Sequence, residues 1–300
     1  MISVIIPTYN SLSTLTKTLQ SIFVQNIKGI EVIIIDDSLD NKIKHHIVSL
    51  NNSFIKYHKN KTVLGTTDSR IKGLLLASNQ YVAFMDHDDI ATNNAYSVLL
   101  NAMKKNNYDF VFSNYIINNH LTKTVIKKNL SIFKENFIKN ILRSPGPFFQ
   151  CCLFKKDFLV NSLNCFDKKA EPSEDWCFFI GVGQNLTNFG YINIYSFVWN
   201  LNEKSQSNNY KKELLALKYI TKKYYSIMFK NSKNNLSLQF RKIGSMFYYL
   251  KEYENSVYYF KKAFETNKLS VKNFILMLTQ IMPKKLYFML MNLYVKKIVS

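Results

Sequence analysis

The first half of the chain alternates between two hydrophobic patterns. Continuous apolar, β-branched segments at 2–6 and 31–35 predict strands that are covered on both faces, as in a parallel sheet. Between them, from Ser11 to Gln25, apolar residues recur every three or four positions, which predicts an amphipathic helix. Further strands are predicted at 54–58, 81–85 and 108–116, and further helices after Asp40, across 67–77 and at 93–106. This alternation predicts a doubly wound α/β domain.

Polar residues follow three of the predicted strands. They form the segments Pro7-Thr8-Tyr9-Asn10, Asp36-Asp37-Ser38 and Asp86-His87-Asp88-Asp89. In α/β sheets, ligands bind beyond the carboxyl ends of the strands, so we expect these segments to converge on one crevice.

The pattern changes after about residue 205, where the strand signals stop. Apolar residues at helical spacing predict helices at 210–230, 236–250, 253–266, 270–280 and 284–298. The stretch 236–266 has the residue spacing of a tetratricopeptide-like (TPR-like) hairpin, and an ordinary pair of packed helices is the alternative. We therefore expect an α/β domain at 1–205 and a basic all-α domain at 206–300.

The basic charge is concentrated in the predicted helical region. The chain carries 40 Lys and Arg against 20 Asp and Glu, a net charge of +20. Residues 1–200 hold 21 basic and 15 acidic groups (+6), whereas residues 201–300 hold 19 and 5 (+14). Lysines beside a Met-, Phe- and Leu-rich segment predict that helices at 270–298 lie on an anionic membrane surface. A partner subunit, a homo-oligomer and a simple solvated surface stay open as alternatives.

The sequence shows neither the pattern of a signal peptide nor that of a membrane span. No charged region followed by a long apolar stretch opens it, and no run reaches the ~18 apolar residues of a membrane span. Its four cysteines lack CxxC spacing, so we expect buried thiols in a reducing compartment rather than a zinc site. We expect a cytoplasmic protein, peripheral on the inner face of the plasma membrane.

The segment YVAFMDHDD carries the most informative chemistry. It delivers Asp86, Asp88 and Asp89 at the end of a predicted strand, and in an extended segment Asp86 and Asp88 lie on the same side, with His87 pointing away. A divalent cation relieves the repulsion between such carboxylates, and hard oxygen ligands favour Mg²⁺ or Mn²⁺. We predict Asp88 and Asp86 as metal ligands, with Asp89 less favoured; a solvated acidic turn is the alternative.

Four motifs in order along residues 1–205 resemble glycosyltransferase family 2. They are SVIIPTYN, EVIIIDDS with Gly65 and Arg70 downstream, FMDHDD, and Ser173-Glu174-Asp175-Trp176. The resemblance implies a GT-A fold with a mixed, Rossmann-like sheet, an inverting reaction and a nucleotide-diphosphate-sugar donor, with a UDP-sugar expected.

The resemblance also implies roles in donor binding. In similar enzymes the residues that match Pro7, Thr8 and Tyr9 line the nucleotide pocket. The residue that matches Asp37 hydrogen-bonds the base, with Asp36 as the adjacent candidate. The arginine that matches Arg70 lies near the base or the diphosphate.

On the same resemblance, Asp86 lies near the ribose and the metal, and Asp88 ligates the metal directly. Asp175 matches the catalytic base, and its neighbour Glu174 is expected to bind substrate or nucleotide. Gly146 belongs to a segment that approaches the donor sugar and the acceptor. The chemistry supports a carboxylate base, because an acceptor hydroxyl is a poor nucleophile until its proton is removed.

Three positions depart from the family pattern. Ile71 stands where an asparagine often follows the arginine, and Val63 where an asparagine commonly precedes the glycine by two. The frequent aromatic-Arg-x-His stretch appears here as Trp199-Asn200-Leu201-Asn202. In the family, that histidine would supply a third protein ligand to the metal or a phosphate contact, and here Asn202 stands in its place.

We expect an inverting, metal-assisted glycosyltransferase that moves a hexose or N-acetylhexosamine to a glycan or lipid-linked acceptor, in bacterial surface polysaccharide, lipooligosaccharide or glycoconjugate synthesis. A sugar-nucleotide nucleotidyltransferase is an alternative, although no glycine-rich loop follows the first strand. A decayed domain acting as a helical-repeat interaction protein is another, against which the intact carboxylates argue. Nucleic-acid binding is not expected, because arginines are few and no recognition motif is present.

Overall fold

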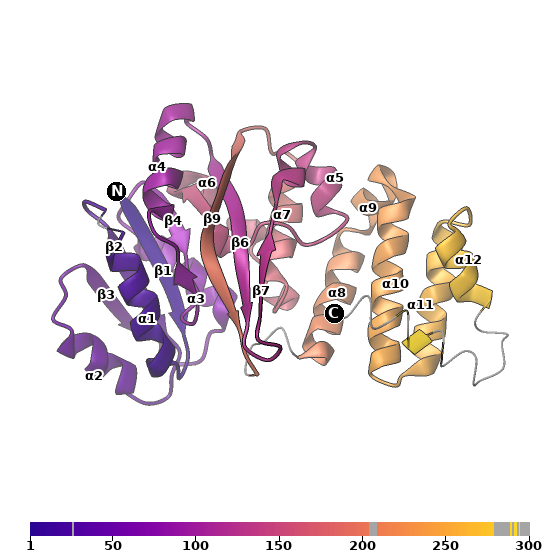
Figure 1. The fold of residues 1–300 in the computed structure, drawn as a ribbon, viewed down its shortest axis with the longest axis horizontal. Helices are drawn as coiled ribbons and strands as arrows, with labels where there is room; N and C mark the ends of the chain where they lie inside the picture. Colours follow the sequence, from indigo (N-terminus) through magenta and orange to yellow (C-terminus); the bar gives the residue numbers. More distant parts are fainter. Residues whose placement is uncertain (26, 204–208, 279–288, 290, 293, 295–300) are drawn as a thin grey trace. The chain divides into compact units, whose positions relative to one another are not determined.

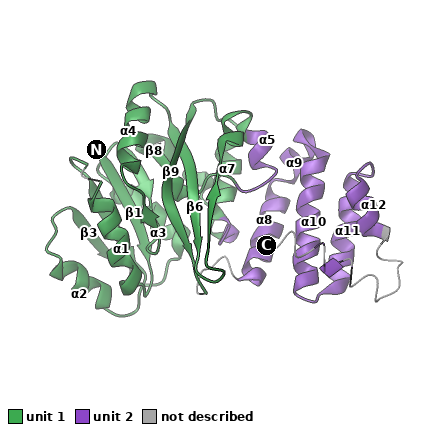
Figure 2. Ribbon diagram, in the orientation of Figure 1, with its two compact units in different colours: residues 1–137, 146–168, 174–205 green, residues 138–145, 169–173, 206–300 purple. Residues whose placement is uncertain are grey.

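The computed structural model describes residues 1–25, 27–203, 209–278, 289, 291, 292 and 294 (Figure 1). The chain divides into two compact units (Figure 2). Unit 1 comprises residues 1–137, 146–168 and 174–205, and unit 2 comprises residues 138–145, 169–173 and 206–300. Two short segments from the middle of the chain therefore belong to the helical unit.

Unit 1 alternates strands and helices along much of its length. Its strands are β1 (Ile2–Thr8), β2 (Glu31–Asp36), β3 (Ile55–Lys59), β4 (Tyr81–Phe84), β5 (Ile90–Ala91), β6 (Phe110–Asn119), β7 (Thr124–Lys128), β8 (Cys152–Lys155) and β9 (Phe189–Leu201). Its helices are α1 (Leu12–Phe23), α2 (Lys42–Ser49), α3 (Thr66–Leu76), α4 (Ala95–Asn106), α6 (Lys156–Asn161) and α7 (Glu174–Gly183). The short helix α5 (Phe137–Ile141) falls almost wholly in unit 2.

Among the described residues, nine strands form one mixed sheet in the order β3-β2-β1-β4-β8-β6-β9-β5, with β7 paired to β6. The four strands from β3 to β4 run parallel, as do β6 and β9, whereas β8 is antiparallel to β4 and β6. The carboxyl ends of β1, β2 and β4 therefore lie at one edge of the sheet, where the polar segments follow them.

The sequence of β1 suits its central position. β1 and β2 are buried along their whole length, which explains their continuous apolar residues. The Met85 N–H donates to the Ile5 carbonyl (3.0 Å), where the pairing of β1 with β4 ends. The nitrogen of Pro7, two residues after Ile5, points to the same side of β1, at a level where β4 no longer pairs with it. The missing N–H of Pro7 therefore costs no strand hydrogen bond.

A phenylalanine-rich core holds α7 in place. α7 is apolar on nearly all sides and buried, as expected for a helix inside a domain. Phe178 and Phe179 pack against other rings of unit 1, namely Phe84, Phe110, Phe149, Phe154 and Phe166 through direct or shared contacts. Because each buried phenylalanine contributes about 1.5–3 kcal/mol, this cluster fixes the first turn of α7, which carries Glu174 and Asp175.

The predicted strands at 2–6, 31–35, 54–58, 81–85 and 108–116 are confirmed as β1 to β4 and β6, whereas β5, β7, β8 and β9 were not predicted. One expectation is wrong. β4 ends at Phe84, and the aspartates that follow lie in a turn, in which the Asp89 N–H donates to the Asp86 carbonyl (3.2 Å). The alternation of an extended strand therefore does not apply to Asp86 and Asp88.

Unit 2 is helical. Its longer helices are α8 (Tyr210–Lys223), α9 (Tyr225–Asn231), α10 (Lys233–Tyr249), α11 (Tyr253–Thr266) and α12 (Val271–Leu278). α10 and α11 form a hairpin so close that a Cβ on Gly244 would lie 2.8 Å from the Phe260 ring, which explains the glycine. The hairpin lies within the predicted stretch 236–266, but its TPR-like character stays a prediction.

Hydrogen bonds within unit 2 tie the two short segments to the helices. The Gln239 side-chain amide donates to the carbonyls of Leu142 (3.1 Å) and Arg143 (3.0 Å). Ser173 Oγ donates to Glu213 Oε1 (2.9 Å). The predicted helix at 284–298, and with it most of the proposed membrane-associating region after residue 278, lies outside the described residues.

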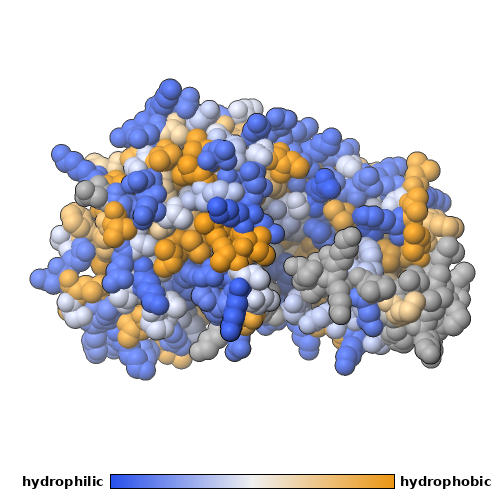
Figure 3. Space-filling model, viewed as in Figure 1, coloured by the Kyte–Doolittle hydropathy of each residue, from blue (hydrophilic) through white to orange (hydrophobic). Residues whose placement is uncertain are grey.

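The surface combines charged and apolar side chains. In the view of Figure 3, apolar side chains gather over the region of β6 and β7, and Val125 and Ile126 on β7 are 68% and 42% exposed. No helix within the described residues is long and apolar enough to span a membrane. None of the four cysteines, all within the described residues, forms a disulfide; Cys165 is half-buried, and the other three are buried.

Candidate active site

The segments that follow β1 and β2 lie side by side. The Asp37 N–H donates to the Thr8 carbonyl (2.9 Å). Thr8 is buried, whereas Tyr9 is 48% exposed. The residues expected to line a nucleotide pocket, Pro7, Thr8 and Tyr9, therefore adjoin Asp37 at the edge of the sheet, and their contact with a nucleotide stays a prediction.

The Asp37 carboxylate is buried and accepts hydrogen bonds from four groups of this chain. Asn60 Nδ2 (2.6 Å) and the Leu64 N–H (3.1 Å) donate to Oδ1, and the Gly65 N–H (2.8 Å) and Ser69 Oγ (3.3 Å) donate to Oδ2. Because an ionised carboxylate offers about four acceptor positions, Asp37 is saturated by the loop that leads into α3. Its expected hydrogen bond to a nucleotide base stays a prediction.

Asp36 is held by its own chain through three hydrogen bonds. It is fully buried; its Oδ1 accepts from the Ser38 N–H (2.8 Å), and its Oδ2 from the Tyr57 hydroxyl (2.6 Å) and from Lys59 Nζ (3.4 Å). Burial and this hydrogen bond raise the pKa of Tyr57. The arrangement is that of a structural group that joins β2 to β3.

Arg70 lies at the centre of a cluster of carboxylates and is 2% exposed. Its Nη1 donates to Glu174 Oε1 (2.5 Å) and its Nη2 to Asp86 Oδ1 (2.7 Å), while Asp175 Oδ1 lies 3.7 Å from Nη1. The guanidinium also covers the Phe149 ring, 5.1 Å from its centroid. Burial lowers the pKa of Arg70, but Asp86, Asp175 and Glu174 together raise it above its ordinary value, so Arg70 stays charged. It thus joins the motif after β4 to the motif that begins α7.

Two groups that we did not predict complete this cluster. The buried Gln150 donates from Nε2 to Asp86 Oδ2 (2.5 Å). The Phe149 N–H donates to Asp175 Oδ2 (3.3 Å). The one feature of the sequence that pointed to Phe149 and Gln150 was their position shortly after Gly146, which was expected near the donor sugar and the acceptor. Gly146 is buried, and its contact with substrates stays a prediction.

The Asp175 carboxylate, the predicted base, lies buried in the first turn of α7. It is 9% exposed, and its buried Oδ1 has no hydrogen-bond partner among the described residues. Burial raises the pKa of Asp175 to about 8; Glu174 and Asp86 add to this rise, and Arg70 opposes it. A carboxylate with a free oxygen and a pKa close to neutral pH suits general-base chemistry.

Asp88 differs from Asp89, its neighbour in the turn. Apart from its own backbone N–H, the Asp88 carboxylate has no hydrogen-bond partner in the part of the chain that the structure describes. Burial and then Asp86 raise the pKa of Asp88, and His87 opposes the rise. Asp89 is buried and accepts from the Asn200 N–H (3.0 Å), and burial, Asp86 and Asp88 raise its pKa well above the usual range. Asp89 therefore belongs to the framework of the turn, whereas Asp88 is open to a ligand.

The turn is fixed by side chains from distant elements. Asn200 Nδ2 donates to the Asp88 carbonyl (2.8 Å). Thr18 Oγ1 on α1 lies within hydrogen-bonding distance of the carbonyls of His87 (2.9 Å) and Asp89 (2.8 Å). Asn200 is one of the positions that depart from the family pattern, and its role here is to hold the backbone of the aspartate turn.

Asp86 and Asp88 offer the oxygen chemistry that a hard divalent cation prefers, and both Asp86 oxygens already accept hydrogen bonds from Arg70 and Gln150. Carboxylate oxygens are preferred ligands of Mg²⁺ and Mn²⁺, and a cation relieves the repulsion that raises the pKa of Asp88. Within the described ranges, no group of three or more His, Cys, Asp or Glu side chains could hold a metal ion. A cation held by two carboxylates would take its other ligands from water and substrate phosphates.

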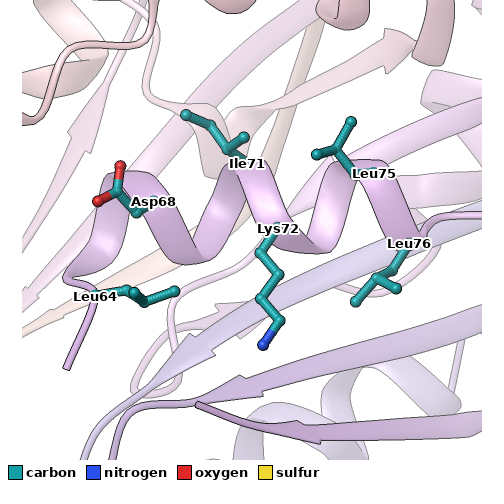
Figure 4. Close-up of a pocket in the computed structure, with 6 residues that line it drawn as sticks. All are labelled: Leu64, Asp68, Ile71, Lys72, Leu75 and Leu76. Carbon is teal, nitrogen blue, oxygen red and sulfur yellow. The ribbon is translucent and has the colours of Figure 1, made fainter. Parts of the chain in front are cut away.

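A separate cavity of about 450 Å³ lies along α3 (Figure 4). It is lined by Leu64, Asp68, Ile71, Lys72, Leu75 and Leu76. None of the predicted catalytic or metal-binding carboxylates lines it, so the candidate active site is not this cavity.

Residues 3–160, more than half of the chain, match the family described as Glycosyl transferase family 2. The chain belongs to this family. It is therefore an enzyme of the glycosyltransferase class, as the four motifs predicted.

Curated relatives are bacterial glycosyltransferases. The chain is 28% identical over 218 residues to the UDP-Glc:alpha-D-GlcNAc-diphosphoundecaprenol beta-1,3-glucosyltransferase WfgD of Escherichia coli, which covers 71% of this chain and 82% of the relative. It is 32% identical to the GalNAc(5)-diNAcBac-PP-undecaprenol beta-1,3-glucosyltransferase of Campylobacter jejuni, over 53% of each chain. It is 27% identical to the poly(ribitol-phosphate) beta-N-acetylglucosaminyltransferase TarP of Staphylococcus aureus, over 69% of this chain and 65% of the relative.

Solved structures show the same fold. S. aureus TarS residues 1–349, in complex with UDP-GlcNAc, align with a TM-score of 0.66 and 18% identity over 99% of this chain and 88% of that one. The mannosyltransferase PcManGT of Pyrobaculum calidifontis, in complex with GDP-Man and Mn²⁺, aligns with a TM-score of 0.62 and 13% identity over 99% and 84%. These likenesses confirm the predicted GT-A-type mixed sheet followed by C-terminal helices.

Proposed function

We propose that this glycosyltransferase moves a hexose or N-acetylhexosamine from a UDP-sugar to a glycan or lipid-linked saccharide, with inversion and with Asp175 as the base. The observation that carries the proposal is the Asp175 carboxylate. Its buried Oδ1 has no hydrogen-bond partner among the described residues, and its pKa is raised to about 8. A relative that acts on UDP-Glc and a structural neighbour in complex with UDP-GlcNAc support the choice of UDP.

In the proposed reaction, Asp175 takes the proton of the acceptor hydroxyl as its oxygen bonds to the anomeric carbon. The bond between that carbon and the diphosphate oxygen breaks from the opposite side, so the configuration inverts and UDP leaves. Arg70 acts as a positioning residue, because it holds Glu174 and Asp86 and lies 3.7 Å from the base. Asp88 and Asp86 would hold Mg²⁺ or Mn²⁺, which supplies positive charge to the leaving diphosphate.

A transfer assay tests this proposal. Purified protein is incubated with Mn²⁺, with UDP-glucose, UDP-galactose, UDP-GlcNAc or UDP-GalNAc, and with an alkyl α-N-acetylglucosaminyl diphosphate as acceptor. We expect transfer from one donor, or its slow hydrolysis to UDP, with a β-linked product by NMR when transfer occurs. Binding of no sugar nucleotide by folded protein would contradict the proposal.

We further propose that residues 1–205 form the catalytic domain and that the basic helices of 206–300 bring it to an anionic, cytoplasmic membrane face in bacterial surface-glycan synthesis. The +14 charge of residues 201–300 supports this. Co-sedimentation with vesicles containing phosphatidylglycerol should fall as salt rises. Salt-independent binding, or none, would contradict the membrane role.

A further inference from the structure

Two aromatic side chains at the edge of the sheet are only half-buried. The rings of Phe148 and Trp199 meet edge to face, with centroids 5.6 Å apart. The buried ring of Tyr115 lies 5.1 Å from Phe148, and the buried ring of Phe197 stacks on Tyr115 at 5.5 Å. A buried aromatic layer therefore supports a partly exposed aromatic pair, which we call the aromatic platform (Phe148 and Trp199).

The sheet positions the Trp199 half of the platform. In the parallel pairing of β6 and β9, Tyr115 lies opposite Phe197 and Ile117 opposite Trp199. Because side chains two residues apart share a face of a strand, Phe197 and Trp199 point to the same side. The ring of Trp199 is thus fixed by a strand and not by a loop.

Each residue of the platform is covalently next to an anchor of the candidate active site. Trp199 precedes Asn200, which binds Asp89 through its N–H and the Asp88 carbonyl through its amide. Phe148 precedes Phe149, whose N–H donates to the Asp175 carboxylate. Each platform residue is therefore one position in the chain from a residue that hydrogen-bonds the aspartate turn or the expected base.

The chemistry of the platform suits a pyranose ring. One face of a sugar presents C–H groups, which pack on aromatic surfaces, and its rim presents hydroxyls. The Trp199 indole N–H has no hydrogen-bond partner within the described ranges and can donate to such a hydroxyl. Of the two sugars in the reaction, the acceptor sugar is the one that must lie against Asp175 to give up its proton.

We infer that Phe148 and Trp199 form the stacking platform that binds the acceptor sugar and aligns its hydroxyl with Asp175. The inference rests on the proposed function and deepens it, because it assigns the acceptor saccharide to a defined surface of this chain. It places no role on the platform in binding UDP or the donor sugar.

The test measures the KM for the acceptor and the KM for the donor separately. With the alkyl α-N-acetylglucosaminyl diphosphate acceptor, Trp199→Leu and Phe148→Leu should raise the acceptor KM about tenfold or more. Trp199→Phe, which keeps a flat ring, should recover most of the loss. The KM for UDP-sugar and the rate of donor hydrolysis without acceptor should change less than about twofold. Tyr225→Leu is the matched control, because Tyr225 and Phe229 form an exposed stacked pair on α9.

A second measurement does not depend on turnover. Acrylamide quenching of Trp199 fluorescence, taken as the difference between wild type and Trp199→Phe, should fall when UDP and methyl glycosides of hexoses or N-acetylhexosamines are added. An unchanged acceptor KM in the leucine variants, a raised donor KM, or no protection by any glycoside would overturn the inference while leaving donor binding intact. Failure to bind any sugar nucleotide would overturn the proposed function and this inference together.

Discussion

Two acidic clusters lie at the same edge of the sheet and differ in what surrounds their oxygens. In the β2 cluster, Asp36 and Asp37 accept hydrogen bonds from backbone and side-chain donors of this chain at every carboxylate oxygen. In the β4 cluster, which we define as Asp86, Asp88 and Asp175, the Asp88 carboxylate and Asp175 Oδ1 lack such partners among the described residues.

The difference separates structural from chemical carboxylates. Burying an acceptor without a partner costs about 1–3 kcal/mol. The buried Asp175 Oδ1 carries this cost, whereas the Asp88 carboxylate is only half-buried. The β2 cluster is complete without a ligand and joins the loop before α3 to the sheet. The β4 cluster is incomplete where the proposed reaction needs a cation and a proton acceptor.

The largest predicted effect is the loss of kcat in Asp175→Asn. An amide cannot take the acceptor proton, so kcat should fall by about 10²–10⁴-fold. Because Asn can still accept from the Phe149 N–H, the variant should fold and bind UDP-sugar as wild type does. Steady-state kinetics and calorimetry check this. Asp157→Asn, an exposed aspartate in the first turn of α6, should be fully active. Equal loss of transfer and donor binding would contradict the role of Asp175.

Arg70→Met removes the cation that compensates the β4 cluster. Uncompensated buried charge costs about 3–5 kcal/mol, so the free energy of unfolding in urea should fall by about that amount. The chain offers a matched control in the exposed Arg143, for which Arg143→Met should change stability by less than about 0.5 kcal/mol. A loss below about 1 kcal/mol for Arg70→Met would show that the carboxylates do not depend on it.

The raised pKa of Asp175 predicts a pH dependence. The base acts only when ionised, and its pKa is about 8, so kcat/KM should rise about tenfold per pH unit below pH 8 and level off above it. The rise should be absent from the residual activity of Asp175→Asn. A profile that is flat between pH 6 and 8 would mean that the rate-limiting proton is held elsewhere.

Asp37→Asn should have the smallest effect of these variants, which is a loss of folding stability. The amide NH₂ would face donors such as the Gly65 N–H and Ser69 Oγ, leaving one or two buried groups unpaired at about 1–3 kcal/mol. Thermal unfolding measures the loss. Asp40→Asn is the control, because Asp40 lies three residues later and is exposed. Unchanged stability of Asp37→Asn would contradict the structural role of the Asp37 carboxylate.

The sequence allowed us to predict the parts of the fold that local pattern determines. Continuous apolar runs identified β1, β2 and β4, because these strands are buried along their whole length. β3 was predicted at 54–58 although it is polar and mostly half-buried. β8 is only four residues long, and β9 is mostly half-buried. Their positions depend on pairing with strands far away in the chain, which no local pattern reveals.

The candidate site was predictable residue by residue but not as an arrangement. Motifs identified Arg70 and Glu174, yet their ion pair joins residues 104 positions apart. The segment Asp86–Asp89 was predicted to be extended, but it forms a turn. The local sequence does not reveal this turn, because Asn200, which holds it, lies 111 positions after Asp89. Gln150 was missed because a glutamine has chemistry only through the carboxylate that it meets in the folded chain.

The central claim, that Asp88 together with Asp86 holds a cation with the donor, is tested most directly by calorimetric titration of UDP-sugars with Mn²⁺ and with EDTA. For wild type we predict binding of one UDP-sugar that weakens about tenfold or more without Mn²⁺. For Asp88→Asn we predict the weak affinity under both conditions. Equal affinity of wild type with and without Mn²⁺, or full metal dependence in Asp88→Asn, would contradict the account.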